Sequence, residues 1–172
     1  MNWVIGVDAS TVSVALVATA VGHPDRFIFD KYKLHKGVVG MKEAQRHSKY
    51  FVQRILSQPA VTAIPVVCIE APVMARMNPQ TTIKQAMVNG AIQVGLHQPE
   101  VEALLMAPPS TWKKNVLGKG NLDKPAITQA ALALCPDVAK FSGDQDLIDA
   151  WCIAQYAGIL YERSLFGVDL SE

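Results

Sequence analysis

The sequence has few cysteines, no long apolar run and no excess of charge of either sign. Its three cysteines, Cys68, Cys135 and Cys152, show no CxxC spacing, so we expect reduced thiols in the core of a cytoplasmic protein. No run approaches the ~20 apolar residues that a membrane helix requires, and no basic segment precedes the apolar N-terminus as in a signal peptide. With 16 Lys and Arg against 15 Asp and Glu, the net charge does not draw the chain to nucleic acid or to a membrane.

What the chain does contain is enough apolar material for one sizeable core. Half of its 172 residues are hydrophobic, and a chain of this length is short for two full domains. We therefore expect a single domain over residues 1–172. Residues 125–172 carry seven acidic and two basic side chains, whereas residues 1–60 carry four acidic and eight basic ones. This polarity suits an acidic centre beside a basic surface that holds a polyanion.

The apolar pattern predicts a mixed α/β domain. Segments rich in β-branched and small apolar residues predict five strands, at 3–8, 12–20, 27–32, 66–70 and 101–107. The first three are joined by short turns, which favours an antiparallel meander. Helical spacing predicts further elements at 42–58, 80–96, 124–135 and 145–160. The 80–96 helix carries an apolar stripe and two glycines, which suits either an oligomer interface or packing within the monomer.

Four carboxylates stand where a charge is costly. Asp8 and Glu70 end apolar runs, while Asp146 and Asp149 open an apolar helix and share one of its faces. None has a Lys or Arg beside it in sequence, and a buried charge must be paired, neutralised or bound to metal. Oxygen ligands favour Mg²⁺ or Mn²⁺ over zinc. The set therefore indicates a divalent-metal site of the kind that performs two-metal phosphodiester hydrolysis.

Each acidic residue also has a simpler interpretation. Asp146 is a first-turn acid favoured by the helix dipole, and Asp8 is able to cap the turn that follows it. Glu70 is hardest to explain without a partner, because it lies between a four-residue apolar run and Ala71-Pro72. Asp144 lies two residues before Asp146 and is an alternative ligand.

Three segments resemble the acidic motifs of RuvC-type Holliday junction resolvases, in the same order and with comparable spacing. They are residues 4–8 (VIGVD), 68–72 (CIEAP) and 146–150 (DLIDA). The lysine-bearing segment from Trp112 through Gly118-Lys119-Gly120 to Lys124 also resembles its counterpart in that family. The resemblance covers residues 3–157.

The resemblance implies an RNase H-like fold: a mixed five-stranded sheet, three antiparallel strands and then parallel ones, flanked by helices. It further implies a homodimer, formed through the 80–96 helix, that makes paired, metal-dependent nicks in a four-way DNA junction. By motif match Asp8, Glu70, Asp146 and Asp149 are the metal ligands for two Mg²⁺ or Mn²⁺ ions, and Lys113 and Lys124 hold the cleaved phosphate. The expected DNA-binding residues are Arg76, Lys84, Lys113, Lys114, Lys119 and Lys124. The expected location is the cytoplasm of a bacterial cell, or of the host cell if a phage encodes the protein.

The chain departs from the family pattern in the loop after Glu70. Family members often place an aromatic side chain there, whereas this sequence has Val73 and Met74, with Met77 as another apolar candidate for a wedge at the junction. Two other functions need the same acidic residues or the same surface: an RNase H-fold nuclease acting on structured RNA, and a non-catalytic junction-binding protein.

Overall fold

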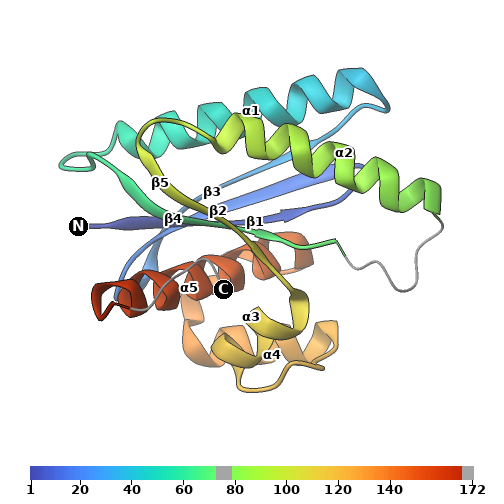
Figure 1. Ribbon diagram of the computed structural model, residues 1–172. Helices are drawn as coiled ribbons and strands as arrows, with labels where there is room; N and C mark the ends of the chain where they lie inside the picture. Colours follow the sequence, from blue (N-terminus) through green and yellow to red (C-terminus); the bar gives the residue numbers. More distant parts are fainter. Residues whose placement is uncertain (73–78, 168–172) are drawn as a thin grey trace.

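The computed structural model describes residues 1–72 and 79–167, so Val73, Met74, Arg76 and Met77 lie outside the described residues. Its centre is a five-stranded sheet with strand order β3-β2-β1-β4-β5 (Figure 1). The strands are β1 (Trp3–Ala9), β2 (Ser13–Ala20), β3 (His23–Lys33), β4 (Ile64–Glu70) and β5 (Val101–Ala107). The first three are antiparallel, and β4 and β5 continue the sheet in parallel with β1. The predicted mixed sheet is confirmed.

Helices cover both faces of the sheet (Figure 1). One face packs against α1 (Val38–Leu56) and α2 (Pro79–Leu96), and the other packs against α5 (Gln145–Leu165). On the same side as α5 lie α3 (Pro109–Leu117), α4 (Lys124–Leu134) and the 3₁₀ helix η2 (Pro136–Phe141), which share one core with α5. None of the helices in the described ranges is long and apolar enough to cross a membrane.

Helix α5 packs closely against β1. Gly6 makes it possible, because a Cβ at this position would overlap the backbone of Ala150 and Ala154. The side chains of β1 alternate between the two faces of the sheet, so Val4, Gly6 and Asp8 point to the α5 side. Val4 belongs to the core formed with α5, which confirms this orientation. The N-terminal part of α5 therefore lies against the end of β1 that carries Asp8.

Three predicted elements extend further at one end in the structure, by four or five residues. The third strand begins at His23, the first helix begins at Val38 and the last helix ends at Leu165. Val38 and Val39 are 60% and 57% exposed, and Gly40 is the buried residue of the first turn of α1, so this turn has no buried apolar side chain from which an amphipathic pattern could be recognised. The glycines of α2 also separate in role: Gly95 packs against the backbone of α1 at Gln45, whereas a Cβ at Gly90 would meet nothing. Packing within the monomer therefore explains the glycine at position 95 and not the one at position 90.

Candidate active site

Asp8 and Glu70 end two neighbouring parallel strands. Val7 of β1 is in register with Ile69 of β4, so the next residues, Asp8 and Glu70, are level with each other. Adjacent strands lie about 4.8 Å apart. Both carboxylates point to the α5 side, because Asp8 alternates with Gly6 and Glu70 alternates with buried Cys68 in the α5 core.

Helix α5 brings two more carboxylates to the same place. Burial raises the pKa of Asp8 well above its usual value, and the negative charges of Glu70, Asp149 and Asp146 add to the effect. Burial, followed by the charge of Asp149, raises the pKa of Glu70 to about 7. Burial also raises the pKa of Asp149. The four acidic residues chosen from the sequence therefore lie close enough to repel one another.

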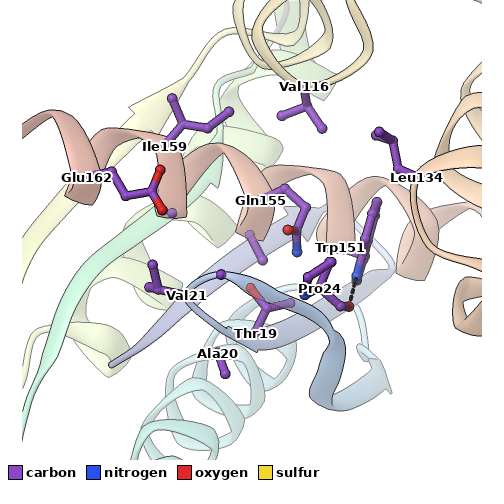
Figure 2. A pocket seen from close by; sticks show the side chains of 13 residues that line it. Thr19, Ala20, Val21, Pro24, Val116, Leu134, Trp151, Gln155, Ile159 and Glu162 are labelled. Atoms are coloured by element: carbon purple, nitrogen blue, oxygen red, sulfur yellow. Dashed lines mark hydrogen bonds between the residues drawn. The ribbon is translucent and has the colours of Figure 1, made fainter. Parts of the chain in front are cut away.

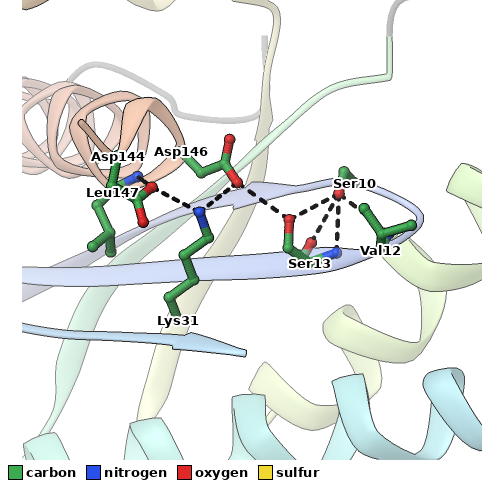
Figure 3. A network of polar contacts seen from close by, with 7 residues as sticks. All are labelled: Ser10, Val12, Ser13, Lys31, Asp144, Asp146 and Leu147. Atoms are coloured by element: carbon green, nitrogen blue, oxygen red, sulfur yellow. Dashed lines mark hydrogen bonds and ion pairs between the residues drawn. The ribbon is translucent and has the colours of Figure 1, made fainter. Parts of the chain in front are cut away.

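Three of these carboxylates have hydrogen-bond donors. The indole Nε1 of Trp112 donates to Glu70 Oε2 at 3.2 Å, and Gln145 Nε2 donates to Asp149 Oδ1 at 2.7 Å. The Oγ of Ser13 donates to Asp146 Oδ2 at 3.2 Å (Figure 3). Asp8 forms no hydrogen bond or ion pair with any residue in the described ranges. It is the least compensated charge of the four, and the one that most needs a cation.

Asp144 and Asp146 differ in what they contact. Asp144 is the N-cap of α5 and accepts a hydrogen bond from the backbone N–H of Leu147 at 3.2 Å. Asp146 contacts Ser13 and lies near enough to Asp8 to raise the pKa of that carboxyl. Both accept from Lys31 Nζ, at 2.7 Å for Asp144 and 2.8 Å for Asp146 (Figure 3). Because Asp144 caps α5, Asp146 is the better placed of the two to bind a metal ion.

Two of the lysines chosen from the sequence lie beside the carboxylates. The positive charge of Lys113 opposes the rise in the pKa of Glu70 and Asp149, and that of Lys124 does the same for Asp8 and Asp149. Lys113 Nζ donates to the carbonyl of Leu122 at 3.2 Å, which ties α3 to the loop before α4. Lys113 and Lys124 thus provide positive charge at the rim of the acidic centre.

The remaining lysines lie on the surface. Lys84 of α2, Lys114 of α3 and Lys119 in the loop after α3 are exposed. Lys84 lines a groove with Val12, His35 and Met87, which places it on the α2 side of the molecule. Arg76 lies outside the described residues.

The donor set suits a hard divalent ion, because all four side chains offer carboxylate oxygens. As they stand, no three His, Cys, Asp or Glu side chains within the described ranges converge closely enough to hold one ion. The hydrogen bonds explain part of this: Asp146 is turned toward Lys31 and Ser13, and Asp149 toward Gln145. The residues therefore fit a divalent ion in their chemistry, and these side chains would have to rotate to complete its coordination.

A cavity of about 270 Å³ lies elsewhere on the molecule, between α5 and the turn that joins β2 to β3 (Figure 2). It is lined in part by Thr19 and Ala20, which pair with Val4 and Trp3 at the opposite end of β1 from Asp8. Among the described residues that line it, Glu162 is the only one with a carboxylate. The cavity does not form part of the acidic centre.

Sequence reasoning missed the partners that orient the carboxylates. Trp112 was identified only as part of the lysine-bearing segment, and Ser13, Lys31 and Gln145 were not identified at all. Gln145 is four residues before Asp149 on one helix, a spacing that predicts contact. Lys31 reaches the acidic centre through strand pairing and the packing of α5, which local patterns do not specify.

No protein-family model matches the sequence, and no curated protein matches it either. The fold does match solved structures. RuvC from Thermus thermophilus aligns with a TM-score of 0.60 and 19% identity, covering 95% of this chain and 96% of that one. The T. thermophilus RuvC in complex with a Holliday junction substrate aligns with a TM-score of 0.65 and 19% identity, covering 92% and 96%. With the observed strand order and flanking helices, these matches show that the chain has a RuvC-like, RNase H-like fold.

Proposed function

We propose that this chain is a divalent-metal-dependent endonuclease that resolves four-way DNA junctions by paired nicks. The observation that carries the proposal is the gathering of Asp8, Glu70, Asp146 and Asp149 at one end of the sheet, with Lys113 and Lys124 beside them. The match to a RuvC structure bound to a Holliday junction supports branched DNA as the substrate.

The four carboxylates would hold two Mg²⁺ or Mn²⁺ ions. Once bound, the ions would activate the attacking water and stabilise the leaving oxygen. Trp112 orients Glu70 through the indole N–H. Lys113 and Lys124 neutralise the scissile phosphate, while the exposed lysines Lys84, Lys114 and Lys119, together with Arg76, hold the flanking phosphates.

Paired cleavage requires two active sites, so we propose a homodimer formed through α2. This helix exposes Ile83, Met87 and Val94, which are 59%, 50% and 59% accessible. Its opposite side is buried against the neighbouring helix and sheet through Val88, Ile92 and Leu96. An apolar stripe left on one side of a packed helix is suited to a second copy of the chain.

Cleavage assays on matched substrates test the proposal. We expect the wild-type protein with Mg²⁺ to cut a four-way DNA junction at least about a hundred-fold faster than linear duplex of the same sequence. Asp8→Asn and Glu70→Gln are expected to bind the junction and not to cut it, because each removes a ligand charge. Asp137→Asn, an exposed acid paired with Lys140 at 3.2 Å on η2, is the matched control and should cut normally.

Other outcomes of these assays would point to a different function or contradict the proposed site. Cleavage of a four-way RNA junction in preference to DNA would indicate the RNA nuclease. Junction binding with no Mg²⁺-dependent cutting of any branched DNA or RNA would indicate the non-catalytic binding protein. Normal cutting by Glu70→Gln would contradict the role given to the acidic centre.

A further inference from the structure

Lys31 is held by two carboxylates at the edge of the acidic centre. Its Nζ lies 2.7 Å from Asp144 Oδ1 and 2.8 Å from Asp146 Oδ2, and Ser13 donates a hydrogen bond to the same oxygen of Asp146 (Figure 3). The side chain of Lys31 is 29% exposed, and those of Asp144 and Asp146 are 30% and 38% exposed. The contacts are therefore screened less than those of a fully solvated ion pair.

The pairing of the strands places Lys31 on the same face of the sheet as the acidic centre. Asp8 of β1 pairs with Ala15 of β2, and Ala15 pairs with Lys31 of β3. Paired residues share a face of the sheet, so Asp8, Ala15 and Lys31 form one row that points toward α5. The small side chain of Ala15 leaves room between the other two for the first turn of α5. The row thus runs from two carboxylates, Glu70 and Asp8, to an ammonium group.

Asp146 interacts both with Lys31 and Ser13 and with the other carboxylates of the acidic centre. Its Oδ2 accepts from both Lys31 and Ser13, yet its charge also acts on Asp8. An ammonium group on Oδ2 neutralises part of the carboxylate charge and would repel a divalent ion bound to the same carboxylate, so the two cations compete for Asp146. Asp144 has no such conflict, because it caps α5 in either case.

We propose that Lys31 is a positioning residue that acts as an internal cation for Asp146 and competes with a divalent ion for this carboxylate, so that metal binding at Asp146 weakens or displaces the ion pair. The inference rests on the metal centre of the proposed function. Lys31 keeps Asp144 as a partner after displacement, so the exchange leaves no unpaired ammonium. Lys31 thereby sets the metal concentration at which the centre fills.

A simpler role for Lys31 is that of a tether between β3 and the start of α5. The two roles make opposite predictions for metal affinity. A tether that is lost loosens α5 and leaves metal binding unchanged or weaker. A competitor that is lost frees Asp146 and makes metal binding tighter.

The test is the Mg²⁺ dissociation constant of the full chain, measured by titration calorimetry without DNA, together with the melting temperature. We expect Lys31→Met to bind Mg²⁺ about three- to ten-fold more tightly than wild type, the effect of removing one partly exposed ion pair. Lys33→Met is the matched control: Lys33 is two residues along the same face of β3 and forms no ion pair with a described residue. Its affinity should stay within about two-fold of wild type, because a charge without contact is screened.

Ser13→Ala provides a second variant should Lys31→Met fail to fold. It removes one hydrogen bond from Asp146 and no charge, so we expect a smaller increase in Mg²⁺ affinity in the same direction. Unchanged or weaker Mg²⁺ binding by both variants, whatever their melting temperatures, would overturn the inference while leaving the metal centre intact. Absence of Mg²⁺ binding by the wild-type protein would instead overturn the metal centre, and the inference about Lys31 with it.

Discussion

Trp112 and Trp151 are both completely buried, yet they contact different groups. Trp112 donates to the Glu70 carboxylate at 3.2 Å, and Trp151 donates to the backbone carbonyl of Pro24 at 3.1 Å. Replacing either tryptophan by phenylalanine removes one hydrogen bond and leaves a small void, so we expect each to lower the free energy of unfolding by about 1–3 kcal/mol. Urea denaturation measures this loss.

The two variants should differ in their effect on the pKa of Glu70. The hydrogen bond from Trp112 lowers the pKa of this carboxyl, so Trp112→Phe should raise the pKa further and weaken Mg²⁺ binding, while Trp151→Phe should change neither. Carboxyl resonances followed by NMR across pH report the pKa. Equal Glu70 titrations in the two variants would contradict an orienting role for Trp112.

The acidic centre also predicts how the metal-free protein responds to pH. The pKa of Glu70 is raised from 4.5 to about 7, so the folded state binds more protons than the unfolded state between these values. The contribution of Glu70 to stability must then fall as pH rises from about 4.5 to about 7, by roughly 3 kcal/mol. The raised pKa values of Asp8 and Asp149 act in the same direction.

Melting temperatures of wild type and Glu70→Gln, measured with a chelator from pH 4.5 to 7.5, check this expectation. The difference between the two proteins should shift in favour of Glu70→Gln as pH rises, because glutamine has no proton to lose. Added Mg²⁺ should reverse the trend for wild type, since it binds the ionised carboxylates. A Glu70→Gln variant whose melting temperature does not rise relative to that of wild type over this range without metal would contradict the raised pKa of Glu70.

At the scale of elements, the contact between β1 and α5 fixes the distance between the two halves of the acidic centre. Gly6→Ala would place a Cβ in the backbone of α5 at Ala150 and Ala154, so we expect a loss of about 3 kcal/mol or more, or failure to fold. Gly158→Ala is the control on the same helix, because its Cβ would lie 3.9 Å from Val4 Cγ2. Helix propensity predicts a neutral effect or a gain of up to about 1 kcal/mol there. Similar melting temperatures for both variants would mean that the contact is not close.

The strands and their order of appearance were predictable because their residues are apolar and their ends carry turn residues or acids. Asp8 and Glu70 were chosen for the same local reason, an acid directly after an apolar run. Trp112 and Lys31 could not be chosen in this way. Their contacts depend on strand register and on where α5 lies, and these follow from packing over the whole sheet rather than from neighbouring residues.

At the scale of the whole molecule, the proposed dimer depends on the exposed stripe of α2. Met87→Glu places a charge in its centre, so we expect a monomer at micromolar concentration and the loss of paired cleavage. Leu134→Glu is the control, because Leu134 is 53% exposed on α4 and should leave the dimer intact. Analytical ultracentrifugation distinguishes the monomer from the dimer. A wild-type monomer, or a Met87→Glu dimer, would show that α2 is not the interface.

The proposed activity requires that the four carboxylates form one metal centre. Crystals grown with Mn²⁺ test this most directly, because Mn²⁺ can be located by its anomalous scattering. We predict an anomalous peak within about 2.0–2.6 Å of carboxylate oxygens from both Asp8 and Glu70, and its loss in Glu70→Gln crystals grown in the same way. A wild-type map with Mn²⁺ bound elsewhere and none between Asp8 and Glu70 would contradict it.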